Sequence, residues 1–261
     1  MTKTRMTMTN NAYSSFAEVY DQLMDDVDYD RWAGYYRDLL LEASGTTPGR
    51  MGRIVECACG TGNLTARLAK MGFQMLGVDL SRQMLRVAEA KMRTYGVNVP
   101  LVCQDMCRLE IPGRAGAVLC TCDGINYLHE PQDVLRFFRR AQTVLKPGGI
   151  LCFDVSTRAK LEGQIGNAFL GEERPGMAYL WQNSWNEHTE SVHMDITFFV
   201  QEQDGRYRRF REEHHLRAYS QAALKEMLTE AGFGKIECFG EMTGEASGPE
   251  DMRMHMRAIK D

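Results

Sequence analysis

The sequence lacks any apolar stretch of the roughly 18 residues that a membrane-spanning helix needs. It also lacks a basic excess, since 31 lysines and arginines stand against 35 aspartates and glutamates, for a net charge of −4. That balance gives no electrostatic footprint for a phosphate backbone, so a nucleic-acid partner is not expected. The first ten residues contain no apolar core of a secretory signal. We therefore predict a cytoplasmic protein with a disordered tail over residues 1–10.

Cysteine is present, but not in the spacing of a metal site or a disulfide framework. The eight cysteines include no CxxC pair and no zinc-finger spacing with histidine. We interpret them as reduced, mostly buried thiols, and no metal is expected. One alternative stays open: Cys57, Cys59, Cys120 and Cys122 could form a metal or redox cluster if adjacent strands present them together.

The order of helical and strand-like segments predicts an α/β fold. Residues 12–43 show the apolar spacing of two helices, with Asp28 as the cap of the second. From Arg53 to Val155, short apolar runs alternate with helical segments, among them a third strand over Val97–Cys103. This alternation favours a mainly parallel sheet with helices on both faces.

After Ser156 the alternation breaks. Two β-like runs, 191–203 and 206–219, flank Asp204-Gly205, which is a strong hairpin signal. We therefore predict an antiparallel insert over residues 157–219, within an α/β domain formed by residues 11–156 and 220–261. The insert carries Trp181 and Trp185, and the second run alternates so that one face has a charged set, Arg209, Arg211, Glu213, His215 and Arg217. This face could roof a pocket, remain solvated, or form a dimer contact.

Two motifs at strand ends indicate a nucleoside cofactor. Gly60 and Gly62 follow the first strand, where a backbone without Cβ can approach a ligand closely. Asp79 ends the second strand, where a carboxylate can accept both ribose hydroxyls. Thr65 occupies the position of the third glycine of a dinucleotide fingerprint, so a pyrophosphate cradle is disfavoured.

Four motifs together resemble the class I S-adenosylmethionine-dependent methyltransferases, in their small-molecule branch with a β-hairpin insert after strand five. They read Glu56-x-x-Cys59-Gly60-Thr61-Gly62, Val78-Asp79-Leu80-Ser81, Cys103-Gln104-Asp105-Met106, and Leu145-Lys146-Pro147-Gly148-Gly149 before Phe153-Asp154. The resemblance implies a Rossmann-like seven-stranded sheet with an antiparallel last strand and N-terminal lid helices. One departure is Ala58, which stands where the family usually has its first glycine.

The resemblance also assigns roles to individual residues, with S-adenosylmethionine as the cofactor and S-adenosylhomocysteine as its product. It implies contacts with the amino-acid part, the ribose, the adenine and the sulfonium from Ala58, Gly60, Gly62, Asp79, Leu80, Met84, Asp105, Met106, Cys122 and Asp123. The N-terminal aromatic residues Tyr13, Tyr20 and Trp32 would close over the cofactor, or would only pack the helices together.

The loop after strand four faces the expected methyl position and contains the catalytic candidates. His129 is a candidate general base and Tyr127 a candidate for positioning the acceptor, although a histidine there is also a common helix-entry or surface residue. We predict methyl transfer to a small-molecule nitrogen or oxygen by in-line displacement, in a monomer or homodimer. The alternatives are a cofactor-binding protein without transfer activity, a methyltransferase acting on protein or RNA, and a nicotinamide-dependent oxidoreductase.

Overall fold

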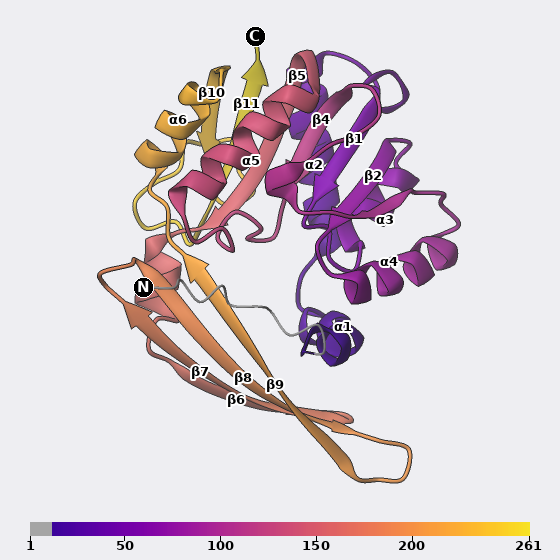
Figure 1. The fold of residues 1–261 in the computed structure, drawn as a ribbon, viewed down its shortest axis with the longest axis vertical. Helices are drawn as coiled ribbons and strands as arrows, with labels where there is room; N and C mark the ends of the chain where they lie inside the picture. The colour runs from indigo at the N-terminus through magenta and orange to yellow at the C-terminus, as the bar shows by residue number, and fades with distance from the viewer. Residues whose placement is uncertain (1–11) are drawn as a thin grey trace, which may run out of the picture.

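The computed structural model describes residues 12–261, with side chains from Phe16 onward. The predicted tail and the side chain of Tyr13 lie outside the described residues. Strands form a 7-stranded sheet, here called sheet A, and a separate 4-stranded sheet, here called sheet B. Figure 1 shows sheet A upright, with sheet B lying across its lower end. No helix in residues 12–261 is long and apolar enough to cross a membrane.

Sheet A has the strand order β10-β11-β5-β4-β1-β2-β3. Strands β1 to β5 are parallel to one another, while β11 runs antiparallel to both of its neighbours, β5 and β10. The strands are β1 (Arg53–Cys57), β2 (Gln74–Asp79), β3 (Leu101–Cys103), β4 (Ala115–Cys120), β5 (Leu145–Ser156), β10 (Phe233–Phe239) and β11 (Arg253–Lys260). The predicted seven-stranded sheet with its antiparallel last strand is confirmed. Parallel strands place their carboxyl ends, and the loops that follow them, at one edge.

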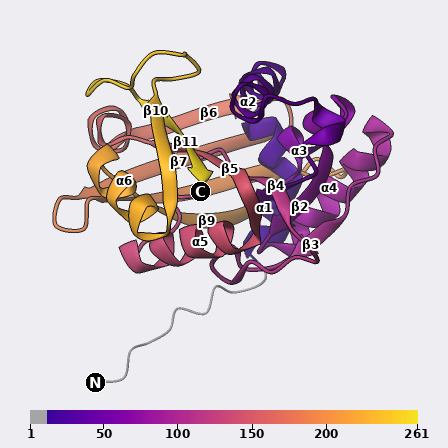
Figure 2. The ribbon, with the colours of Figure 1, turned by 90° about the horizontal axis from the view of Figure 1, so that it is seen from above.

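Helices cover both faces of sheet A, as Figure 2 shows from above. They are α1 (Ala12–Leu23), α2 (Tyr29–Ser44), α3 (Asn63–Lys70), α4 (Arg82–Tyr95), α5 (Pro131–Val144) and α6 (Gln221–Glu230), with short turns η1 (Pro48–Arg50), η2 (Met106–Arg108) and η3 (Ala159–Gln164, a π-helix). One apolar cluster packs α5 and α6 on the sheet, and another packs α2 and α3 on its opposite face. Asp28, the predicted cap of α2, accepts a hydrogen bond from the first turn of its helix, and Ser81 at α4 and Ser220 at α6 do the same.

Sheet B has the order β6-β7-β8-β9 and is antiparallel throughout. Its strands, β6 (Phe169–Arg174), β7 (Met177–Asn186), β8 (Ser191–Gln201) and β9 (Tyr207–Arg217), all fall within the predicted insert. One face, here called the inner face, packs Ile196 and Phe198 against Phe16 of α1. The charged set on β9 points to the opposite, outer face, so the inner face carries the alternate residues of that strand.

Two strand predictions need correction. The third strand is only Leu101–Cys103, because Pro100 has no N–H for the ladder and marks the point where pairing begins. The strands β6 and β7 were not predicted. Almost every residue of β6 is exposed, so the strand has no apolar alternation by which a sequence pattern could reveal it.

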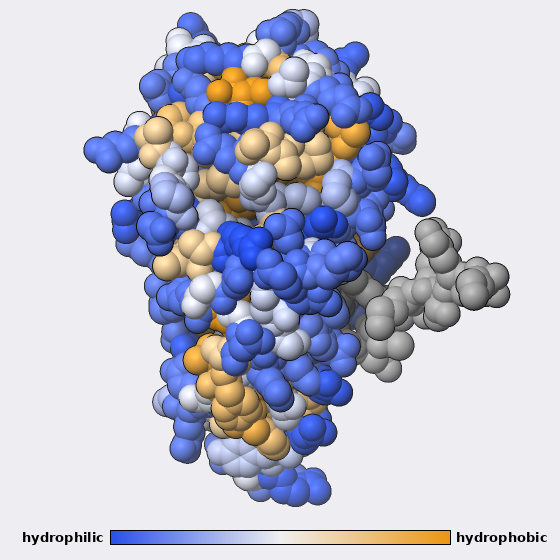
Figure 3. Space-filling model, turned by 90° about the vertical axis from the view of Figure 1, so that its left-hand side faces the viewer, coloured by the Kyte–Doolittle hydropathy of each residue, from blue (hydrophilic) through white to orange (hydrophobic). Residues whose placement is uncertain are grey.

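The β6 edge of sheet B is apolar and open. Exposed large hydrophobic side chains in this part of the sheet include Phe169, Leu170 and Leu180. Figure 3 shows hydrophobic side chains gathered over the lower part of the molecule, where sheet B lies. An exposed edge strand of this kind offers unpaired backbone groups with which another strand can pair.

Candidate active site

The loop between β1 and α3 contains three residues in the left-handed region. Ala58 has φ 53°, Gly60 has φ 54° and Gly62 has φ 74°. A Cβ built on Gly60 meets no heavy atom within 4 Å, whereas one on Gly62 would lie 2.6 Å from Met92 Cε. Gly60 therefore leaves open space that a ligand can enter, and Gly62 allows close packing of the loop on α4. Ala58 adopts a conformation that costs a side chain energy.

Asp79 ends β2 beside this loop. Its Oδ2 accepts a hydrogen bond from Gly60 N at 2.8 Å and its Oδ1 accepts one from Ser81 N at 2.8 Å. Burial raises the pKa of Asp79, and the backbone donors act in the opposite direction. Each carboxylate oxygen keeps a further lone pair, so Asp79 can still accept hydrogen bonds from two hydroxyl groups.

A partly apolar shelf extends from the end of β2 to the end of β3. Leu80 is 64% exposed, although it is a large hydrophobic residue, while Met84 is buried. Asp105 Oδ1 accepts a hydrogen bond from Cys107 N at 2.8 Å, which caps η2, and Met106 packs against the core. An exposed apolar side chain near a carboxylate suits a flat ring with polar edges.

The turn after β4 has a strained backbone and is held by hydrogen bonds to Asp154. Cys122 and Asp123 have φ values of 54° and 68°, which non-glycine residues rarely adopt. Their backbone N–H groups donate to Asp154 Oδ1 at 2.8 Å and Asp154 Oδ2 at 3.2 Å. Strain of this kind persists only where the surroundings enforce it, and it concentrates at functional sites.

Arg253 on β11 joins Asp123 of this turn to Asp154 of β5. Its Nη1 lies 2.6 Å from Asp123 Oδ1 and also contacts Asp154 Oδ2. Burial raises the pKa of Asp123, but the charges of Arg253 and Lys160 and the hydrogen bonds from Arg253 and Ser156 together lower it overall. Tyr36 OH donates to Asp154 Oδ1 at 3.1 Å. The charge of Lys160 also acts on Asp123, so two cations, Arg253 and Lys160, balance the carboxylates of Asp123 and Asp154.

Helix α1 is fastened to the β1–α3 loop through Asp21. Its Oδ1 accepts hydrogen bonds from Thr61 Oγ1 at 2.7 Å and Asn63 Nδ2 at 2.9 Å, and Lys91 Nζ lies 2.7 Å from its Oδ2. Burial alone would raise the pKa of Asp21, but these partners lower it. These contacts hold α1 across the carboxyl edge of sheet A.

Tyrosines from three segments meet next to the β4 turn. Burial raises the pKa of Tyr20 well above its ordinary value, and the nearby side chains of Tyr29, Cys122 and Tyr127 raise it further. The pKa of Tyr29 is raised in the same way by burial and by Cys122. Both phenols therefore keep their protons at neutral pH and can donate hydrogen bonds.

The inner face of sheet B lies against α1 and the loop after β4. Phe16 lies with its ring centroid 5.7 Å from Phe198 and 5.1 Å from His214, and Tyr127 OH lies 3.3 Å from His214 Nδ1. Glu212 is only 2% exposed, its Oε1 has no hydrogen-bond partner among the described residues, and burial raises its pKa to about 7. Burial lowers the pKa of His214 to about 4, so its ring is neutral. This face thus presents polar groups in an aromatic setting.

Comparisons with known proteins agree with this geometry. A family model described as a methyltransferase domain matches residues 54–149. A protein of Geobacillus sp. (strain WCH70) is 36% identical over 250 residues, covering 95% of this chain and 99% of that protein. YqeM of Bacillus subtilis (strain 168) is 33% identical over 249 residues, covering 95% and 97%. Both carry names that class them as methyltransferases and state no acceptor.

A solved structure is similar over nearly the whole chain. The S-adenosylmethionine-dependent methyltransferase from Clostridium acetobutylicum ATCC 824 has a TM-score of 0.84 and 30% identity, covering 96% of this chain and 99% of that chain. The chain belongs to the class I S-adenosylmethionine-dependent methyltransferases. A sugar N-methyltransferase from Streptoalloteichus sp. ATCC 53650 shares the fold, with a TM-score of 0.74 at 19% identity.

The residues of this methyltransferase fit its cofactor, S-adenosylmethionine. The open space at Gly60, the free lone pairs of Asp79 and the exposed Leu80 follow one another along the carboxyl edge of sheet A. The carboxylate of Asp123 lies at the end of this path, where it can face a sulfonium cation. These features lie in the order that a nucleoside joined to an amino acid requires.

The structure brings together most of the predicted site residues of the methyltransferase. Tyr20, Cys122 and Tyr127 lie close together. Trp32 is buried, and Arg253 Cζ lies 5.2 Å from the centroid of its ring. His129 lies apart from them in a groove on the outer face of sheet B.

Several side chains at this site were not singled out from the sequence. They are Asp21, Tyr29, Glu56, Lys91, Asp154, Glu212, His214 and Arg253. Glu56 and Asp154 stand inside the quoted motifs, so their positions were already marked. Arg253, His255 and Arg257 alternate with apolar residues in a strand that lies inside the sheet, and this pattern was an available signal for buried charge. Asp21 directly follows Tyr20 in the N-terminal helix that resembles a lid helix, but no role was assigned to it, and nothing in the sequence indicated Glu212.

Proposed function

We propose that this methyltransferase transfers the methyl group to a nitrogen or oxygen atom of a small molecule, which binds between the inner face of sheet B and the carboxyl edge of sheet A. The observation that carries the proposal is that sheet B lies against the carboxyl edge of sheet A, where His214 contacts Phe16 of α1 and Tyr127 of the loop after β4. A site between the inner face of sheet B and the carboxyl edge of sheet A admits a small acceptor more readily than a folded protein or an RNA helix.

We assign the cofactor contacts as the family resemblance implies. Ala58, Gly60 and Gly62 face the amino-acid part, Asp79 holds the ribose, and Cys122 with Asp123 lies beside the sulfonium. The adenine contacts are Leu80, Met84, Asp105 and Met106. Tyr13 and Tyr20 belong to the lid helix, with Trp32 as its inner support.

When bound, the cofactor supplies an electrophilic methyl group on a positively charged sulfur. The chain has to hold the acceptor in line with that methyl group and keep water out. The carboxylate of Asp123, held in place by Arg253, can face the positive charge of the sulfur. Tyr20 and Tyr29 keep their protons and can orient the acceptor by hydrogen bonds.

A nitrogen acceptor is favoured over oxygen by Glu212. A buried carboxylate oxygen without a partner is costly, and an ammonium group is the ligand that would compensate it best. The aromatic rings of Phe16 and Phe198 near this strand add cation–π attraction. We assign acceptor positioning to Tyr127 and His214, and not to His129, because His129 lines the groove on the outer face.

The first experiment measures cofactor binding. Calorimetric titration should show binding of S-adenosylmethionine and S-adenosylhomocysteine but not NAD, and Asp79→Ala should weaken it about 100-fold, since two hydrogen bonds to a charged group are lost. Asp204→Ala, in the exposed hairpin of sheet B, is the matched control and should bind normally. Asp79→Asn separates loss of charge from loss of fold. Failure of the wild-type chain to bind either sulfur nucleoside would contradict the cofactor assignment.

The second experiment screens acceptors by release of S-adenosylhomocysteine. Panels of small amines and of alcohols and phenols should give turnover with amines, reduced at least tenfold in Glu212→Gln with cofactor affinity unchanged. Turnover of alcohols alone would overturn the nitrogen preference. Cofactor binding without turnover of any small molecule would instead favour the non-transferring or macromolecular alternatives.

A further inference from the structure

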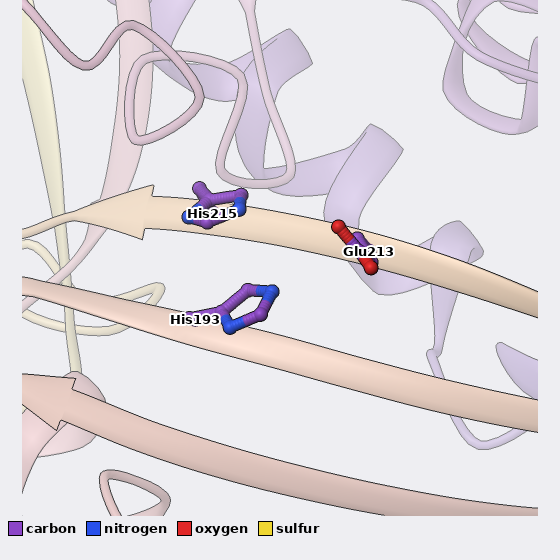
Figure 4. Close-up of side chains that lie close together, drawn as sticks. All are labelled: His193, Glu213 and His215. Atoms are coloured by element: carbon purple, nitrogen blue, oxygen red, sulfur yellow. The ribbon is translucent and has the colours of Figure 1, made fainter. Parts of the chain in front are cut away.

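We propose that the outer face of sheet B binds a divalent transition-metal ion of the zinc type, with His193, Glu213 and His215 as ligands. Each offers one ligand atom, and these atoms all lie within 4.8 Å of one another. Figure 4 shows the two β9 side chains, Glu213 and His215, beside His193 on the neighbouring strand β8. The proposal is independent of the methyl acceptor, because this site lies on the face opposite Glu212 and His214.

Strand pairing brings these ligands together. His193 and His215 are direct partners in the antiparallel register of β8 and β9, and their rings stack 4.2 Å apart with an interplanar angle of 15°. Glu213 precedes His215 by two residues, so both side chains leave the same face of the strand. Two ligands spaced by two on one strand and a third directly across form a compact set on a rigid backbone.

The imidazole of His193 lacks a partner that a metal ion would supply. Its Nε2 is buried and has no hydrogen bond among the described residues. A buried nitrogen without a partner costs free energy, and coordination would remove that cost. Glu213 Oε1 lies 3.4 Å from Arg211 Nη2, but Arg211 also holds both oxygens of Asp195 in an exposed pair. An exposed contact of this kind is weak and leaves Glu213 available.

His129 is placed to become a fourth ligand. Its ring centroid lies 5.7 Å from that of His215. From the loop between β4 and α5, His129 lines a groove of about 520 Å³ together with His193 and His215. Three imidazoles and a carboxylate form a donor set that suits tetrahedral zinc. The metal would fasten this loop to β9, and thereby hold Tyr127 in place on the inner face.

The test uses the full chain without a histidine tag, after treatment with a chelator. Calorimetric titration with Zn²⁺ should show one site per chain, and Co²⁺ should give the visible absorption of a tetrahedral complex. We expect His193→Gln and His215→Gln each to weaken Zn²⁺ binding at least tenfold. His188→Gln, an exposed histidine in the turn between β7 and β8, is the control and should bind normally. His129→Gln should weaken binding less and shift the Co²⁺ spectrum.

Circular dichroism and S-adenosylmethionine affinity, which should not change, show that each variant remains folded. Absence of Zn²⁺ binding by the wild-type chain would overturn the proposal. Equal binding by wild type and a folded His193→Gln variant, or an equal loss in His188→Gln, would also overturn it, because the ion would then lie elsewhere.

Discussion

The active site lies between two walls, the carboxyl edge of sheet A and the inner face of sheet B, which differ in how their buried charged groups are paired. At the carboxyl edge of sheet A, Glu56 accepts hydrogen bonds from Thr65 and Thr121, and Asp154 accepts from Arg253 and from backbone N–H groups. On the inner face of sheet B, Glu212 has an oxygen with no partner among the described residues. The buried carboxylates of the first wall are paired before any ligand binds, whereas Glu212 in the second wall has an oxygen that is still free to accept a hydrogen bond.

This difference indicates separate tasks. A cofactor with a fixed shape can be recognised by groups held in place by their neighbours, which lowers the cost of binding. A polar group left unpartnered in a buried position reduces stability, and its retention is explained most simply by a ligand that pairs with it. The sheet A wall therefore fits the invariant methyl donor, and the sheet B wall fits the acceptor that distinguishes one methyltransferase from another.

The largest effect is expected from removing Arg253, because the sheet A wall would then contain unpaired buried carboxylates, as the sheet B wall does. Arg253→Met leaves Asp123 and Asp154 buried without their counter-charge, and we expect a loss of about 3–5 kcal/mol in the free energy of unfolding. Urea denaturation measures this. Arg37→Met removes an arginine from an exposed ion pair on α2 and should change stability by less than about 1 kcal/mol. A similar small effect in both variants would show that the buried network is not needed.

Neutralising Glu212 should remove the cost carried by the sheet B wall. Burial raises the pKa of Glu212 from 4.5 to about 7, so the folded state binds this proton more tightly than the unfolded state. The folded wild-type chain is therefore most stable below pH 4.5 and loses stability as pH rises towards 7. Glu212→Gln should therefore be more stable than wild type at pH 8, by about 2 kcal/mol, and similar to it at pH 4.5. Thermal unfolding across this range measures the difference.

The control is Glu213→Gln in chelator-treated protein, since Glu213 is the exposed neighbour on the outer face. It should leave the pH dependence unchanged. If the two variants behave alike, the inner face has no special protonation behaviour.

Ala58 offers the smallest and most local change. At φ 53° a glycine is less strained, so Ala58→Gly should raise stability by roughly 0.5–1 kcal/mol and the midpoint of thermal unfolding by a few degrees. Ala66→Gly, in the middle of α3, should do the opposite by about 1 kcal/mol. A fall in the unfolding temperature of Ala58→Gly would mean that the alanine side chain contributes packing that outweighs the strain.

Much of the cofactor wall could be predicted because its residues lie next to each other in the sequence. Gly60, Asp79 and Asp105 each follow a strand within a short motif, and the family resemblance fixed their order along the edge. The acceptor wall could not be predicted in this way. The alternation on β9 was recognised, but the charged face was considered for the roof, and the structure turns Glu212 and His214 inward instead.

The sequence by itself determined the parallel sheet, the capped helices, the cofactor motifs and the hairpin at Asp204-Gly205, since each depends on a local pattern of apolar residues, caps and turns. Only the tertiary structure decided which face of sheet B is buried, which lid residue pairs with Lys91, and that Arg253 joins Asp123 to Asp154. It also brought His193 against His215. These contacts join residues 22 to 130 positions apart, and the pairing of distant strands and the docking of α1 create them, so no local pattern encodes them.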